Sequence, residues 1–153
     1  MRINWLGVII SAIIMFIVRY LWAAHFGGAD WAHFATKAVA DVQANHKAAG
    51  MALGAAVVTS AVLGWAIGLL RDRSLVSGVG VGIMTAVGFA ATTMSAEYIF
   101  YGAPLKTFLI DSGQYLAAYV IGGAIIGAMA PKTRIRAAYS LSAEPAAAEH
   151  HDH

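Results

Sequence analysis

Four long apolar segments alternate with short polar ones along the 153-residue chain. They run from about residue 5 to 24, 48 to 70, 76 to 100 and 105 to 130. About 20 mainly apolar residues in a helix cross a hydrocarbon layer roughly 30 Å thick, and a helix satisfies its own backbone hydrogen bonds there. The pattern therefore predicts an all-α membrane protein, a bundle of four transmembrane helices.

Two of the connections between these segments are very short. Residues 71–74 join the second segment to the third, and residues 101–104 join the third to the fourth. Connections of this length make consecutive helices antiparallel neighbours, and Pro104 suits a helix start because its missing N–H costs nothing there. We expect one four-span membrane domain over residues 1–136. The Ala, Ser and Glu tail at 137–153 is predicted to be disordered and cytoplasmic.

The one long connection, residues 25–47, has an amphipathic pattern. Trp31 and Phe34 fall on one side of a helix, Asp30 and Lys37 fall on the other, and Asp30 is a suitable N-cap. The pattern predicts a short helix at the membrane interface, with its aromatic residues toward lipid or the bundle. A solvated loop helix without lipid contact is the alternative.

The distribution of positive charge predicts the orientation. In a four-span protein the N-terminus, the second connection and the tail share one side, which carries six Lys and Arg residues against three on the other side. The six are Arg2, Arg71, Arg73, Lys132, Arg134 and Arg136, and the three are Lys37, Lys47 and Lys106. Cytoplasmic connections carry the excess of Lys and Arg. We therefore expect a multi-pass protein of a bacterial inner membrane with both termini cytoplasmic.

Composition agrees with a membrane protein and excludes several classes. Hydrophobic residues make up 59% of the chain and charged residues 12%, and the mean hydropathy is +0.68. The net charge of +2 and the scattered basic residues do not suit nucleic-acid binding. Without cysteine there is no disulfide framework or thiolate nucleophile. Arg19 and Trp22 are out of place in a cleavable signal peptide, so the first helix is predicted to be retained.

Small residues recur four positions apart in three of the segments. The pairs are Gly50 with Gly54, Gly64 with Gly68, Gly78 with Gly82, and Gly123 with Gly127. In lipid this spacing lets helix backbones approach closely, so it predicts helix-packing faces. The glycines at residues 78–82 lack the Lys-Ser/Thr ending and the strand-to-helix setting of a phosphate-binding loop.

Metal-competent side chains are present, but their spacing does not define a site. Those in the long connection are His25, Asp30, His33, Asp41 and His46. One pair at helical spacing lacks a third placed ligand, so a solvated face is the preferred interpretation. The terminal run 150–153 could hold a divalent ion loosely, but it has no surrounding groups to fix its geometry. We expect no metal, no cofactor and no catalytic residues.

Five polar residues in or near the apolar segments are the main candidate site, namely Arg19, Glu97, Lys106, Asp111 and Gln114. A charge in hydrocarbon costs several kcal/mol, so each must face the interior, pair or extend to the headgroups. Helix rise places Arg19 about 8 Å and Asp111 about 10 Å below the outer boundary. We predict one buried polar cluster in which Arg19 pairs with Asp111 and Glu97 lies nearby.

Two stretches carry a family pattern. The first is Asn4-Trp5-Leu6, followed by Leu21-Trp22, Phe26-Gly27 and Trp31, and the second runs from Gly88-Phe89-Ala90-Ala91-Thr92-Thr93 through Tyr98-Ile99-Phe100, Gly102, Pro104-Leu105-Lys106, Phe108-Leu109-Ile110-Asp111 and Gly113 to Gly123-Ala124-Ile125-Ile126-Gly127. Over roughly residues 3–130 the chain resembles a bacterial membrane family, the domain of unknown function 1761. Ala23 and Ala24 depart from the Tyr and Pro of that family, and Arg19 departs from a small or apolar residue. The resemblance implies a four-span protein of unestablished activity.

Three functions are compatible with these features. The first is a structural or accessory membrane subunit, whose partners are the lipid bilayer and either itself or another membrane protein. The second is a small transporter or ion-conducting oligomer that uses the predicted polar cluster. An intramembrane enzyme is the least favoured, because no metal triad, activated nucleophile or paired carboxylates at catalytic spacing occur in the sequence.

The predicted topology can be tested with single cysteines in this cysteine-free chain. With Ala44→Cys on the outside and Ser142→Cys in the cytoplasm, a membrane-impermeant maleimide should label only Ala44→Cys in intact cells. Labelling of both after the membrane is opened is the control. Labelling of Ser142→Cys alone in intact cells would reverse the orientation.

Overall fold

The computed structural model describes residues 3–26, 46–102 and 104–131. Its helices are α1 (Trp5–Phe26), α3 (His46–Leu69), α4 (Leu75–Thr85), the π-helix η1 (Ala86–Ala91), α5 (Thr92–Tyr101) and α6 (Leu105–Ala128). The segments α4, η1 and α5 are continuous and make one rod. The described helices therefore form four rods, each long and apolar enough to cross a membrane. This confirms the predicted all-α, four-span architecture. The predicted interfacial helix and the predicted disordered tail lie outside the described residues.

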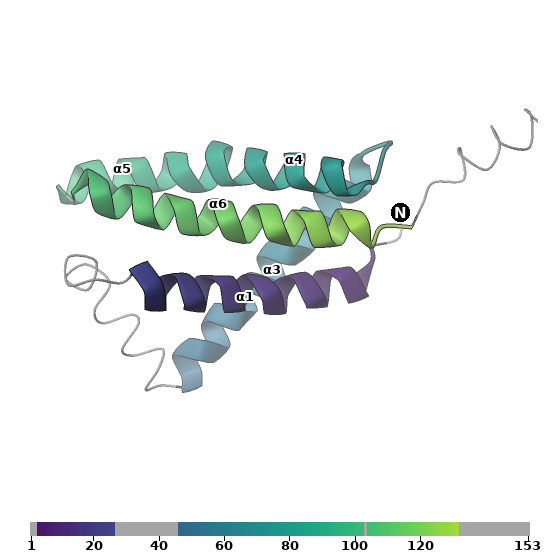
Figure 1. Ribbon diagram of the computed structural model, residues 1–153, viewed down its shortest axis with the longest axis horizontal. Coiled ribbons are helices and arrows are strands. Elements are labelled where there is room, and N and C mark those ends of the chain that lie inside the picture. The colour runs from purple at the N-terminus through teal and green to yellow at the C-terminus, as the bar shows by residue number, and fades with distance from the viewer. Residues whose placement is uncertain (1–2, 27–45, 103, 132–153) are drawn as a thin grey trace, which may run out of the picture.

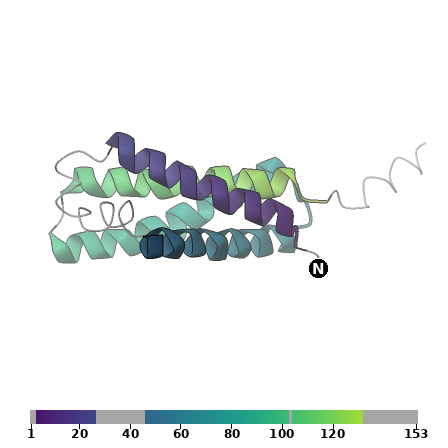
Figure 2. The same ribbon diagram turned by 90° about the horizontal axis from the view of Figure 1, so that it is seen from below.

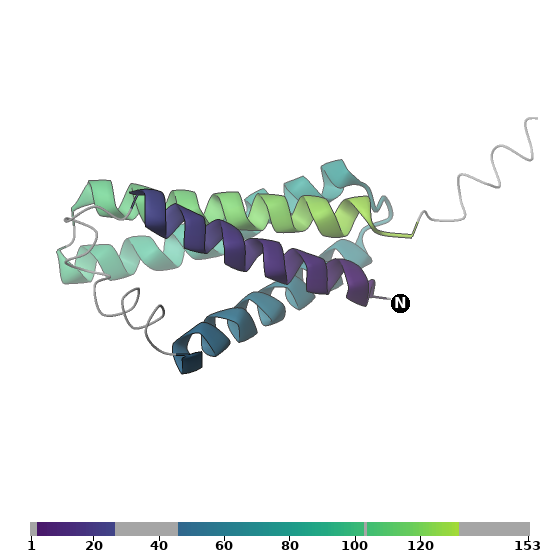
Figure 3. The same ribbon diagram turned by 60° about the horizontal axis from the view of Figure 1, so that its bottom comes forward.

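Three of the rods lie along the long axis, and the fourth crosses them. Figure 1 shows α6 between α1 and the α4–α5 rod, while α3 runs obliquely across the bundle. Figure 3 shows the first half of α3 pointing away from the other helices. Among the described side chains of α3, the buried ones begin at Ala56. In Figure 2 the start of α1 and the end of α6 lie at the same end of the bundle, here called the proximal end. The opposite end is the distal end.

The closest contact in the bundle joins the backbones of α4 and α6. A Cβ added to Gly78 would lie 2.1 Å from the carbonyl oxygen of Gly123, and a Cβ added to Gly123 would lie 2.2 Å from the carbonyl oxygen of Gly78. Gly82 meets the Tyr119 carbonyl in the same way at 2.4 Å, and Gly127 meets that of Ser74 at 2.3 Å. Two glycine pairs thus form one seam, in which only hydrogen atoms fit between the backbones.

The other predicted glycine pairs lie in different surroundings. A Cβ on Gly64 would lie 2.9 Å from Cγ2 of Val8, so this glycine receives a side chain of α1 rather than a backbone. Gly68 is half-buried near the end of α3. Within the part of the chain that the structure describes, no atom lies within 4 Å of a Cβ added to Gly50 or Gly54. These two glycines are exposed on the half of α3 that leaves the bundle.

A π-helical turn interrupts the third rod, which the sequence predicts as one uniform helix. Gly78 and Gly82 contact the backbone of α6, and Tyr98 bonds Asp111 of α6. Buried or half-buried residues recur every fourth position between them, at Ala86, Ala90 and Met94. An α-helix turns about 100° per residue, so a seam with this repeat drifts about 40° at each step. The wider turn of η1 offsets part of that drift. The Thr92 hydroxyl donates to the carbonyls of Gly88, at 2.7 Å, and Phe89, at 3.1 Å.

Small polar groups join α1 to α3, and α1 packs on the other face of α6. Ser11 and Ser60 lie 3.2 Å apart, and the Ser60 hydroxyl is 3.3 Å from the sulfur of Met15. All three residues are at most 1% exposed. A Cβ added to Gly122 would lie 2.6 Å from that sulfur, so Gly122 provides the space for Met15. The glycine pair pattern did not identify Gly122, because the residues four positions away are Ala118 and Ile126.

The apolar core lies between these contacts. It consists of Met15, Leu63, Ile67, Ala118 and Ile126.

A side-chain hydrogen bond and a glycine mark two of the helix ends. The Ser74 hydroxyl accepts from the Ser77 N–H at 3.3 Å and begins α4. Gly102 ends α5 at φ +63°, a left-handed conformation that glycine adopts without strain. The four rods begin and end within about two residues of the predicted apolar segments.

The seam predicts different effects on stability for alanine substitutions at two nearby glycines of α4. Gly82→Ala should lower the free energy of unfolding by about 1–3 kcal/mol, because a methyl group must separate two packed backbones. Gly80→Ala is the matched control, since nothing lies within 4 Å of an added Cβ among the described residues. Thermal unfolding in detergent measures both variants. Equal stability of the two would show that the helices do not meet through Gly82.

Candidate functional site

The candidate site consists of polar side chains at the distal end, where α1 ends and α6 begins. We call Arg19, Tyr98, Asp111, Gln114 and Tyr115 the distal polar cluster. One residue comes from α1, one from α5 and three from α6. The apolar core separates this cluster from the proximal end. Charged groups at such a depth require local partners.

Two consecutive residues of α6 hold Arg19. Its Nη2 donates to the Tyr115 hydroxyl at 3.1 Å, and its guanidinium carbon lies 4.7 Å from the centre of the Tyr115 ring. The Nε2 of Gln114 donates to the backbone carbonyl of Arg19 at 3.0 Å. Gln114 is 7% exposed and Arg19 is half-buried. A hydroxyl and an aromatic face therefore stabilise the guanidinium.

A neighbouring aromatic contact fixes the end of α1. The indole N–H of Trp22 donates to the Ile110 carbonyl at 3.1 Å, and its ring lies against Gly113, where an added Cβ would be 3.1 Å from Cζ2. The Trp22 ring also packs against Phe26 with ring centres 4.6 Å apart. An indole with its N–H bonded is typical of the boundary between lipid tails and headgroups. This contact holds α1 in the register that brings Arg19 to Tyr115.

A second polar pair joins α5 to α6. The Tyr98 hydroxyl donates to the Oδ2 of Asp111. The Tyr98 ring also meets the Phe108 ring edge-on at 5.7 Å between centres. Helical side chains lean toward the N-terminus of their own helix, so Tyr98 and Asp111 lean toward each other across two antiparallel helices. The long phenol reaches a carboxylate that is too short to reach the headgroups itself.

The structure shows two partners that the sequence did not predict, and it exposes two members of the predicted cluster. The Arg19 guanidinium lies on Tyr115 and the Asp111 carboxylate accepts from Tyr98. The predicted Arg19–Asp111 pair stays a prediction. Glu97 and Lys106 are exposed rather than buried. The predicted depths did not include the rotation of each helix about its axis. They also omitted tyrosine, whose hydroxyl can partner a charge at the end of a long side chain.

Sequence analysis missed Tyr98, Tyr115 and Trp22 as members of the site. One usable signal was present, because Asp111, Tyr115 and Tyr119 recur every fourth residue on one face of α6. The Tyr115 and Tyr119 rings meet at 5.7 Å. Polar-tipped aromatic residues on the same face as a membrane carboxylate are candidates for its partners.

The described residues contain no metal centre. No group of three or more His, Cys, Asp or Glu side chains among residues 3–26, 46–102 and 104–131 could hold a metal ion. Asp30, His33 and Asp41 lie outside the described residues, as does the terminal His run. The cluster that the structure does describe offers hydrogen bonds and a π face, which are means of holding charge and joining helices.

The Tyr98–Asp111 bond can be measured with a double-mutant cycle. Tyr98→Phe and Asp111→Asn should show a coupling free energy of about 1 kcal/mol in detergent unfolding, because the first removes the donor and the second replaces the charged acceptor of the same bond by a weaker neutral one. Tyr101→Phe is the matched control on α5, since Tyr101 is 79% exposed. Its effect should add to that of Asp111→Asn. Additive behaviour of Tyr98→Phe as well would rule out the bond.

Comparison with known proteins gives one match. A family model described as a protein of unknown function (DUF1761) matches residues 6–127. No curated protein and no solved structure matches the chain. The match covers α1 from position 6, α3 and the α4–α5 rod in full, and α6 up to position 127, and it includes every member of the distal polar cluster. The chain belongs to the DUF1761 family of proteins of unknown function.

Proposed function

We propose that this protein is a structural or accessory subunit of a membrane assembly, and that it binds another membrane-spanning protein laterally. Its four apolar helices indicate a multi-pass membrane protein. The proposal includes a bacterial inner-membrane location with both termini cytoplasmic, on the basis of the Lys and Arg asymmetry. It assigns no catalytic step to the chain.

The first half of α3 carries the proposal. Met51 and Val58 are 76% and 64% exposed, and Gly50 and Gly54 form an open notch one helical turn long. By contrast, Gly64 receives a side chain of α1, and the pairs Gly78 with Gly82 and Gly123 with Gly127 receive backbone atoms. Small residues at this spacing let a second helix approach closely in lipid. A membrane helix of a partner protein fits this notch.

The distal polar cluster supports a subunit more than a conducting path. Gln114 and Tyr115 each bond Arg19, and Asp111 accepts from Tyr98. Groups that bind a passing ion or substrate must exchange partners with it, whereas these bonds join α1, α5 and α6. The cluster therefore holds the distal ends of three helices together.

Affinity capture from cells in mild detergent tests the proposed subunit. The full chain should recover one membrane protein in a fixed ratio, and Gly54→Leu should lose it because the leucine fills the notch. Gly80→Leu is the control, since Gly80 lies on α4 and nothing described is within 4 Å of an added Cβ. Both variants should unfold at the temperature of the unmodified chain.

Two results would contradict this function. Recovery of the chain alone, or only with copies of itself, would remove the accessory role. Ion or solute flux into liposomes that contain only this protein, lost in Arg19→Met, would instead favour the small transporter or ion-conducting oligomer.

A further inference from the structure

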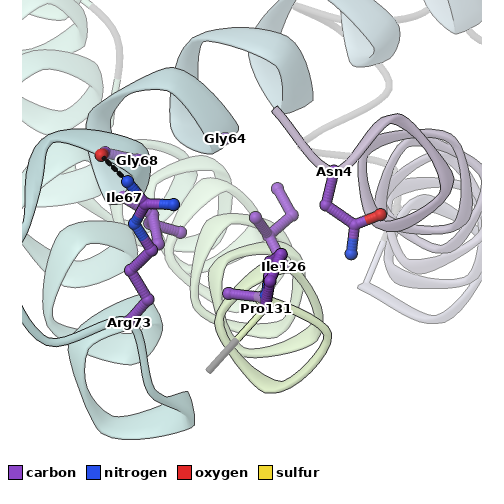
Figure 4. A pocket seen from close by; sticks show the side chains of 8 residues that line it. Asn4, Gly64, Ile67, Gly68, Arg73, Ile126 and Pro131 are labelled. Atoms are coloured by element: carbon purple, nitrogen blue, oxygen red, sulfur yellow. Dashed lines mark hydrogen bonds between the residues drawn. The ribbon is translucent and has the colours of Figure 1, made fainter. Parts of the chain in front are cut away.

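A shallow pocket lies at the proximal end, far from the distal polar cluster. It is bounded by the start of α1, the ends of α3 and α6, and the connection that leads into α4 (Figure 4). The lining residues that matter here are Asn4, Ile67, Gly68, Arg73, Ile126 and Pro131. The pocket therefore forms where all four rods reach the same membrane boundary.

The walls of this pocket combine an apolar floor with one cation. Ile67 and Ile126 belong to the core and are 1% and 3% exposed. The side-chain amide of Asn4 is occupied, since it donates to the Met129 carbonyl at 2.6 Å and accepts from the Gly7 N–H at 3.2 Å. Arg73 is the group that remains to bind a ligand.

The Arg73 side chain is held in place but only partly bonded. Its Nη2 donates to the Gly68 carbonyl at 2.7 Å, which fixes the guanidinium at the end of α3 (Figure 4). Its Nε is enclosed and has no hydrogen-bond partner among the described residues. The adjacent carboxylate of Asp72 accepts from the Ser74 hydroxyl. A buried N–H of a cation without an acceptor favours the arrival of an anionic oxygen.

The position of Arg73 matches the level of lipid phosphates. It lies between the end of α3 at Leu69 and the start of α4 at Leu75, where the chain leaves the apolar layer. Arg71 is exposed in the same connection, and in the sequence Lys132 follows the lining residue Pro131. Basic pockets between membrane helices attract anionic headgroups.

We propose that this pocket binds the phosphate of an anionic phospholipid. The guanidinium of Arg73 donates to the phosphate oxygens. The bound lipid joins the ends of α1, α3, α4 and α6. This inference is independent of the lateral partner proposed for α3.

Thermal unfolding of the purified full chain in detergent tests the site, with dioleoyl phosphatidylglycerol, dioleoyl phosphatidylcholine or inorganic phosphate added separately. Phosphatidylglycerol should raise the unfolding temperature, and the other two should not. Arg73→Gln should weaken phosphatidylglycerol binding about tenfold, through loss of charge-assisted bonds. Arg71→Gln removes the same charge from the same connection and should weaken it less than about threefold.

A second variant separates lipid binding from folding. Ala130→Leu narrows the pocket and leaves Arg73 in place, so it should fold and lose the phosphatidylglycerol effect. Native mass spectrometry should count one retained phosphatidylglycerol per chain, and none in this variant. Equal losses in Arg71→Gln and Arg73→Gln, or an equal effect of phosphatidylcholine, would overturn the proposal. Stabilisation by inorganic phosphate alone would assign the site to a soluble anion and overturn the lipid.

Discussion

The contact of α4 with α6 through glycine backbones is the constraint on which the other helices depend. Lipid tails are as apolar as the side chains they replace, so helices in a membrane associate through close packing rather than through release of water. Gly78 and Gly123 bring two backbones together, which leaves the Gly122 side of α6 facing α1. Met15 and Ser11 fill that side, and Ser11 meets Ser60 of α3.

The same seam explains the π turn and the position of one polar pair. A repeat of four residues cannot follow one face of a regular α-helix through the five intervals from Gly78 to Tyr98, so the third rod widens at Ala86–Ala91. The family-like stretch from Gly88 to Thr93 includes most of this turn and Thr92, whose hydroxyl donates to two of its carbonyls. As a result Tyr98 faces α6, where it bonds Asp111.

The polar chemistry of the protein is divided between its two ends. At the distal end, Arg19 and Asp111 each have a tyrosine partner, and the bonds join three helices. At the proximal end, Arg73 bonds one carbonyl and has an enclosed N–H without an acceptor among the described residues. The first group is bonded within the described helices, whereas the second is the one for which we propose an anion. Gly50 and Gly54 likewise have no neighbour within 4 Å of an added Cβ among the described residues, and there we propose a lateral partner.

The sequence alone determined the number, length and order of the helices, because the thickness of the apolar layer sets how many apolar residues each must contain. It also identified the glycines of the seam by their spacing. Only the tertiary structure decided which glycine faces meet, since Gly50 and Gly54 have the same spacing as Gly78 and Gly82. It also decided the partners of Arg19 and Asp111. Depth follows from counting residues along a helix, but the direction of a side chain depends on how each helix is rotated against its neighbours.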